Sequence, residues 1–223
     1  VNGGRVAGVE TTEGPILTGT VVCAAGAWSV PLLSGIGVEV PVEAQRVQVA
    51  ILNRPMAMPL EGTMTYVDTA AGFFCRNWGP SRTFAGVGGG EFHDIVDPFA
   101  YDERSDPGFG SVVVDYISRR MPAMAGATIL YGYAGIYDMT PDTHPILSGV
   151  DGLDGLFLML GFSGAGFKKG PATGACMAEL ISQGRSSTVD LTPFRLSRFA
   201  DESWREPWSP DEYSFSTDFG HKF

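Results

Sequence analysis

Short apolar runs separated by glycine and proline make up the first part of the sequence. The run VVCAAGAW at 21–28 ends in small residues, which is typical of a buried strand that leads to a close backbone approach. From Val40, the sequence VPVEAQRVQVAIL alternates imperfectly between apolar and polar positions, and short runs follow at 64–74 and 83–87. This alternation predicts a largely antiparallel sheet with one face in water.

One amphipathic helix is predicted after these runs. Val113, Tyr116 and Ile117 recur at helical spacing, and Pro122 is a stop signal. We expect this helix to cross the antiparallel sheet. A strand that turns at Thr140-Pro141-Asp142 follows, and the apolar run GLFLML then predicts a short, fully buried strand.

A second helix is predicted over 171–183. Pro171 suits the first turn of a helix, Ala175, Ala178 and Ile181 share one face, and Gly184 is typical of the position after a helix end. From Thr192 onward, the polar and aromatic sequence predicts an extended arm over the surface.

The sequence GFSGAGFKKG precedes this helix and predicts a glycine-rich loop. Free N–H groups, the positive end of the helix dipole, Lys168 and Lys169 would gather there. Such a place suits an anionic group: a phosphate, a carboxylate, or the N1–C2=O edge of a reduced flavin. A tight corner whose glycines only allow strand and helix to pack explains the same residues equally well.

Charge and cysteine content exclude several classes of partner. The 223 residues carry a net charge of −10, which disfavours nucleic acid and anionic membranes as partners. Cys23, Cys75 and Cys176 lie far apart without a C-x-x-C pair, so neither a disulfide framework nor a zinc site is indicated. The histidines show no metal-ligand spacing either, and we expect no metal site. A reducing cytoplasm is the simplest location, and the longest apolar stretch is too short to span a bilayer.

Common nucleotide-binding motifs are absent. Neither Lys168 nor Lys169 fits G-x-x-x-x-G-K-[ST], and no G-x-G-x-x-G occurs anywhere in the chain. A serine hydrolase is an alternative, because GFSGA resembles a nucleophile elbow and Asp190 and His221 follow in hydrolase order. Gly166, Gly170 and Pro171 argue against this alternative, because they are expected to delay the helix that must follow the serine directly.

Three stretches together resemble the D-amino-acid-oxidase-like flavoenzymes, and among them the sarcosine oxidase, glycine oxidase and dimethylglycine dehydrogenase group. They are VVCAAGAWSVPLL, AGIYDMTPDTHPIL and GFSGAGFKKGPATGACMAELISQG, in the family's order and approximate spacing. The similarity extends to about Phe199 and includes FRLSRF, which looks like the family's closing element.

The resemblance implies a mixed α/β fold in which a partial FAD-binding domain is interrupted by a substrate domain with an antiparallel sheet. The FAD-binding part would comprise 1–39 and 132–185 without the N-terminal Rossmann unit. The substrate domain would be 40–131, and 186–223 would form a C-terminal tail.

The resemblance also implies a set of site residues. Lys168 would hold the substrate carboxylate, and Tyr137, which the pattern alone explains equally well as an ordinary strand aromatic, would line the pocket. FAD would be held by residues of three segments: Gly26, Trp28, Gly135, Gly164, Ala165, Gly166 and Lys168.

Three departures from the family pattern matter for the cofactor and the substrate. Some sarcosine oxidases attach FAD through a cysteine at the position of Gly135, so FAD is expected to be noncovalent here. Ala165 stands where those oxidases carry histidine, which puts sarcosine itself in doubt as substrate. The N-terminal strand and G-x-G-x-x-G that bind the ADP half of FAD are missing, and the chain starts inside a hairpin-like pattern. FAD binding is therefore expected only with that half, in cis or in trans.

The resemblance implies a fragment or subunit of an enzyme that oxidises the C–N bond of an amino acid or N-methyl amino acid by hydride transfer to FAD. The chain alone is expected to be inactive. The main alternative is a catalytically silent fragment or assembly subunit that does not bind flavin by itself.

Overall fold

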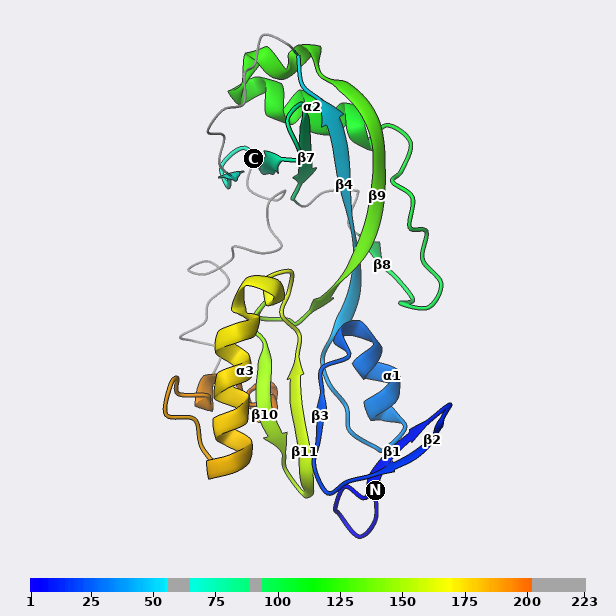
Figure 1. Ribbon diagram of the computed structural model, residues 1–223, viewed down its shortest axis with the longest axis vertical. Helices are drawn as coiled ribbons and strands as arrows, with labels where there is room; N and C mark the ends of the chain where they lie inside the picture. The colour runs from blue at the N-terminus through cyan, green and yellow to red at the C-terminus, as the bar shows by residue number, and fades with distance from the viewer. Residues whose placement is uncertain (56–64, 89–93, 202–223) are drawn as a thin grey trace. The chain divides into compact units, whose positions relative to one another are not determined.

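The computed structural model describes residues 1–55, 65–88 and 94–201, and the chain forms two compact units (Figure 1). The first unit contains Val1–Glu43 and continues from Tyr137, and the second contains Ala44–Ile136. Each unit combines helices with a β-sheet, so the expected mixed α/β class is confirmed. The expected domain boundaries remain a prediction.

A three-stranded sheet is the centre of the first unit. Its middle strand β11 pairs antiparallel with β10 and parallel with β3. A separate hairpin, β1 with β2, precedes it in the sequence. The bounds are β1 Gly8–Thr11, β2 Gly14–Leu17, β3 Val21–Cys23, β10 Ile146–Val150 and β11 Leu153–Leu160.

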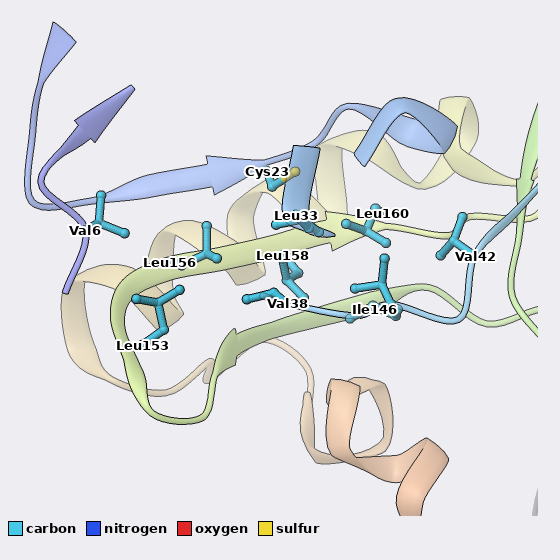
Figure 2. Close-up of a cluster of buried hydrophobic side chains, with 11 residues drawn as sticks. Val6, Cys23, Leu33, Val38, Val42, Ile146, Leu153, Leu156, Leu158 and Leu160 are labelled. Carbon is cyan, nitrogen blue, oxygen red and sulfur yellow. The ribbon is translucent and has the colours of Figure 1, made fainter. Parts of the chain in front are cut away.

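Helices α1 (Ser29–Ser34) and α3 (Gly166–Gln183) belong to the same unit. Figure 2 shows the core side chains of β11 together with Leu33 of α1 and Val38 of the connection that follows it. Burying each leucine or valine side chain contributes about 1.5–3 kcal/mol. The buried cluster consists of Val6, Cys23, Leu33, Val38, Val40, Val42, Ile146, Leu153, Leu156, Leu158 and Leu160.

The second unit is built on a larger sheet. The strands lie in the order β5-β6-β7-β4-β8, with β9 also paired to β4, and the pairs β5–β6, β6–β7, β7–β4 and β4–β8 are antiparallel as predicted. The bounds are β4 Glu43–Asn53, β5 Tyr66–Asp68, β6 Phe73–Asn77, β7 Arg82–Val87, β8 Asp94–Ile95 and β9 Thr128–Met139.

Helix α2 (Phe109–Arg120) covers one face of this sheet and confirms the predicted amphipathic helix. Val113 and Ile117 are fully buried. Their spacing of four residues puts both on the face that packs against the strands. The second core consists of Ala50, Leu52, Phe73, Cys75, Ala85, Val87, Phe109, Val113, Ile117 and Met124.

The predicted start of α3 is wrong. The helix begins at Gly166 and contains Pro171 in its interior. The left-handed residues of the preceding loop end with Gly164 (φ 79°), so the backbone is free to enter a helix five residues earlier than the proline indicated. Pro171 has no N–H for the carbonyl four residues before it, which belongs to the fully exposed Phe167.

The extended arm expected from Thr192 is also wrong for the residues described. Thr192–Phe194 and Leu196–Ala200 form 3₁₀ turns. Two kinds of contact hold these turns in place. Leu196 and Phe199 pack against the core of the first unit, and Arg198, which is 1% exposed, forms an ion pair with Asp142. His221, the base of the hydrolase alternative, lies outside the described residues.

Candidate functional site

The glycine-rich loop between β11 and α3 has the backbone of a tight corner. Gly161, Ser163 and Gly164 all have positive φ angles, of 73°, 50° and 79°. A side chain at Gly161 would collide with the methyl group of Thr140. Glycine is therefore required here both for backbone conformation and for space.

Hydrogen bonds hold this loop against the end of β9. Gly161 N donates to Asp138 Oδ2 at 2.7 Å, and Ser163 N donates to the Asp138 carbonyl at 3.1 Å. The Thr140 N–H donates to Ser163 Oγ at 3.2 Å. Asp138, Thr140 and Ser163 thus position the loop, and no sequence motif points to this role for Asp138 or Thr140.

Tyr137 lies directly against the loop. A Cβ atom added at Gly164 would come within 2.7 Å of Tyr137 Cε2, so the ring occupies the space that any side chain there would need. The residue keeps 37% of its surface exposed, and burial of the rest raises the pKa of its phenol. At neutral pH the hydroxyl is protonated and can donate a hydrogen bond.

The N-terminus of α3 is uncapped and carries positive charge. No side chain caps it and its first turn holds no acidic residue. Lys168 is exposed and makes no hydrogen bond or ion pair with any residue in the described ranges. Burial, together with the neighbouring charge of Lys168, lowers the pKa of Lys169. Free N–H groups and two lysines at a helix N-terminus suit an anionic group.

Gly26, from another part of the chain, lies near Asp138, which holds the glycine-rich loop. It begins the turn Gly26–Trp28 with a φ of 56°, and its added Cβ would lie 3.9 Å from Asp138 Oδ2. Trp28 is 41% exposed. The turn of Gly26 therefore lies close to the Asp138 carboxylate oxygen that accepts a hydrogen bond from Gly161 N.

The first unit thus brings together Gly26, Tyr137 and the loop with Lys168. Gly135 is the exception among the expected site residues, because it belongs to the second unit. A Cβ atom at Gly135 would meet no atom within 4 Å, so the position is open.

Ser163 does not have the surroundings of a nucleophile. Its Oγ lies in hydrogen-bonding distance of the Thr140 N–H, Thr140 Oγ1 and the Gly161 carbonyl. The ring of His144 bonds to the Asp142 carbonyl, and Asp190 bonds to Thr192 N. The earlier start of α3 removes one argument against a hydrolase, but the hydrogen bonds of Ser163 explain it as a loop-positioning residue.

The described part of the chain contains neither a candidate metal cluster nor a candidate membrane-spanning helix. No group of three or more histidine, cysteine, aspartate or glutamate side chains there could hold a metal ion. No helix in those residues has the length and apolar character needed to cross a membrane. Taken together, the geometry is that of a glycine-rich corner whose uncapped helix N-terminus and lysines suit an anionic group.

The chain belongs to the DAO family of FAD dependent oxidoreductases, whose model matches residues 1–180. It is 29% identical over 197 residues to sarcosine oxidase subunit beta of Rhizobium meliloti, covering 88% of this chain and 44% of that protein. It is 29% identical over 201 residues to glycine oxidase of Pseudomonas aeruginosa, covering 86% of this chain and 50% of that protein.

A solved structure has the same architecture. L-proline dehydrogenase from P. horikoshii superposes with a TM-score of 0.75 at 27% identity, over 88% of this chain and 51% of that one. The chain thus spans about half the length of the relatives it matches. Its curated relatives include oxidases of amino acids and N-methyl amino acids.

Proposed function

We propose that this chain is the C-terminal half of a flavoenzyme that oxidises the C–N bond of an amino acid or N-methyl amino acid. The observation that carries the proposal is the uncapped N-terminus of α3 behind the loop Gly161–Ala165, with Lys168 in its first turn. Family membership supports FAD as the group it serves.

The residues of this corner fit the pyrimidine edge of a flavin. The edge becomes anionic on reduction, and the N–H groups at the start of α3 have no side-chain cap to compete with it. Gly164 and Gly166 allow close approach to the backbone, while Gly26 and Trp28 would contact the rest of the cofactor. When bound, FAD would supply the hydride acceptor for oxidation of the substrate C–N bond, and the resulting imine would be hydrolysed by water.

Two side chains would orient the substrate. The Lys168 ammonium would bind the substrate carboxylate, a charge-assisted contact of about 1.5–3 kcal/mol. Tyr137 would border the pocket, with a protonated hydroxyl as a donor. Its ring also shields one side of Gly164, which limits where water can reach the loop.

Binding of FAD would require a complementing segment, in cis or in trans. Among the described strands, β3 pairs only with β11, so one of its edges is open. Apolar residues are exposed nearby in the sequence, including Leu17 (86%) and Leu32 (58%). An open strand edge is where a further strand would pair. The cofactor would be noncovalent, because Gly135 offers no nucleophile.

The test is an absorption spectrum of the purified chain, alone and together with its complementing N-terminal half, before and after addition of FAD. We expect a flavin spectrum that bleaches with an amino acid substrate only when both halves are present. Lys168→Met should then raise the substrate KM at least tenfold and leave the bound flavin spectrum in place. Unchanged substrate affinity in Lys168→Met would remove that residue from the proposal.

An assembly subunit without flavin is the second candidate. It is favoured by the partial coverage of the relatives, one of which is named as a subunit. A protein that stays colourless with its complement and FAD, yet forms a stable complex, would establish this alternative instead.

A further inference from the structure

The sheet of the second unit has a face that α2 does not cover. Phe73 and Cys75 of β6 belong to the core under α2. Because side chains alternate along a strand, Phe74 and Arg76 point to the opposite face. This face carries a cluster of rings and one guanidinium.

Three aromatic side chains form a platform there. The ring centroid of Phe84 lies 5.9 Å from those of both Phe74 and Trp78. Gly86 completes the packing, because a Cβ at that position would lie 2.5 Å from Phe74 Cζ. Spacings of this size are those of favourable aromatic pairs, so the platform is fixed by its own contacts.

Arg76 lies across this platform. Its Cζ is 4.6 Å from the centroid of Phe84 and 4.9 Å from that of Trp78. Such stacking uses the face of the guanidinium and leaves the N–H groups at its edge. No residue of the described ranges accepts a hydrogen bond from Arg76 or forms an ion pair with it, and the side chain is exposed. The result is a pre-positioned fork of free donors, which matches a carboxylate.

A hollow of about 530 Å³ adjoins the platform and shares Trp78 with it; it is lined by Trp78, Gly79, Pro80, Ser81 and Arg82. Arg54 fixes this turn by donating to the carbonyls of Gly79 and Pro80 at 3.1 and 3.0 Å. Trp78 N also donates to the Arg82 carbonyl at 2.9 Å. The lining of the hollow therefore includes one aromatic ring and one arginine, in a chain whose net charge is −10.

We propose that Arg76, Trp78 and Phe84 form a binding site for an organic carboxylate with an apolar or aromatic body. The carboxylate binds at the guanidinium edge, and the body lies against Trp78 in the hollow. The proposal goes beyond the flavin site of the first unit and stands independently of it.

The test titrates the full chain with 3-phenylpropionate by calorimetry. Saturable binding is expected. The matched neutral probe 3-phenylpropionamide should bind about tenfold more weakly, because it lacks the charge that Arg76 recognises. Arg76→Met should weaken 3-phenylpropionate binding about tenfold or more, and Arg76→Lys should restore only part of it, since an ammonium has no planar fork. Arg185→Met, at an exposed arginine of the first unit, is the matched control and should change nothing.

Either of two results with the wild-type chain would overturn the site: no saturable binding to the folded protein, or equal affinities for the acid and its amide. Unchanged binding in Arg76→Met would do the same. The acid and amide comparison is made on the wild type, so it decides even if a variant misfolds.

The carboxylate can be that of the substrate or that of a separate ligand, and one experiment distinguishes them. In the complex with the complementing half, a flavin-reducing substrate that competes with 3-phenylpropionate would identify a substrate subsite. Binding without competition would identify a separate ligand. Failure to bind FAD would overturn the proposed function and leave this site untouched.

Discussion

Among the described residues, each unit contains one nearly inaccessible arginine, and the two arginines differ in the segments they hold. In the first unit Arg198 donates to both oxygens of Asp142, at 2.7 and 3.0 Å, and to the His144 carbonyl at 2.8 Å. In the second unit Arg46 donates to Asp106 Oδ1 at 2.9 Å and to the carbonyls of two further residues. Arg198 attaches its segment to the turn between β9 and β10, whereas Arg46 of β4 attaches the segment 102–106 to its strand.

The Arg198 network continues to the candidate site. His144 also presents its carbonyl to Thr140 Oγ1 at 2.8 Å, and the Thr140 N–H donates to Ser163 Oγ in the glycine-rich loop. The Arg46 network instead includes Gln48, which exchanges two hydrogen bonds with Asp106, and is centred on a surface segment. Loss of Arg198 should therefore disturb the loop, whereas loss of Arg46 should only destabilise its own unit.

The largest expected effect is that of Arg198→Met. Burial alone would raise the pKa of Asp142, but the hydrogen bonds and charge of Arg198 lower it overall, so the variant leaves an unpaired carboxylate. Removing one partner of a buried pair costs about 3–5 kcal/mol of unfolding free energy, measured by urea denaturation. Amide exchange at Gly161 and Ser163 should also accelerate. Arg195→Met, whose ion pair with Asp201 is more exposed, is the control and should cost less than about 1 kcal/mol. Amide exchange at Gly161 and Ser163 that stays at the wild-type rate in Arg198→Met would contradict the proposed connection between Arg198 and the loop.

Arg46→Met should cost less, about 2–3 kcal/mol. Arg46 is 4% exposed, but the side chain of its partner Asp106 is 37% exposed and can be hydrated when the pair is lost. The hydrogen bond from Arg46 is the main cause of the lowered pKa of Asp106. Exchange at Gly161 and Ser163 should stay at the wild-type rate, and an acceleration there would show that the two networks are not separate.

Gly164→Ala changes the loop without touching either arginine. An alanine would have to adopt a φ of 79° and place its methyl group against the Tyr137 ring, for a cost of about 2 kcal/mol. Adding Tyr137→Leu should remove the share of this destabilisation that comes from the collision with the ring. The share that comes from the positive φ angle should remain. Equal unfolding free energies for the single and double variants would mean that the ring is not the obstacle.

The hydrogen-bond networks are harder to predict from the sequence than the helices and strands. Helix α2 could be predicted because Val113, Ile117 and the stop at Pro122 lie within one short pattern. The start of α3 could not, because Pro171 fits the first turn of a helix as well as it fits the interior position it occupies. The geometry that ends the loop early is set by Asp138, whose partner Gly161 is 23 residues away.

In the candidate site, too, local features can be predicted from the sequence and contacts between distant residues cannot. The glycines and lysines of the loop stand together in the sequence and could be chosen as a group. Arg198 reaches Asp142 across 56 residues, and no local spacing marks such a pair. Arg76 alternates with buried residues like any exposed strand residue, and only the folded sheet places its guanidinium over two rings.

The smallest effect should come from Glu179, which tests whether burial or the number of hydrogen bonds decides the strength of such networks. Its carboxylate accepts bonds from the side chains of Ser186 and Thr188 and from the N–H groups of Ser187 and Thr188. These bonds, led by that of the Thr188 hydroxyl, lower its pKa from 4.5 to about 2. Because the folded pKa is the lower one, the stabilisation is fully present above pH 4.5 and is lost as the pH falls through about 2.

An NMR titration of the Ser187 and Thr188 amide shifts checks this directly, with a midpoint expected near pH 2. Glu179→Gln keeps the shape of the side chain but removes its charge, and it should abolish the titration while changing the unfolding free energy less than Arg198→Met does. Water competes with each of the four hydrogen bonds to the exposed Glu179 carboxylate and can replace them when they are lost. Water has much less access to the pair of Arg198 and Asp142, so its lost hydrogen bonds are replaced less completely. A Glu179→Gln loss as large as that of Arg198→Met would mean that hydrogen-bond number outweighs burial in this fold.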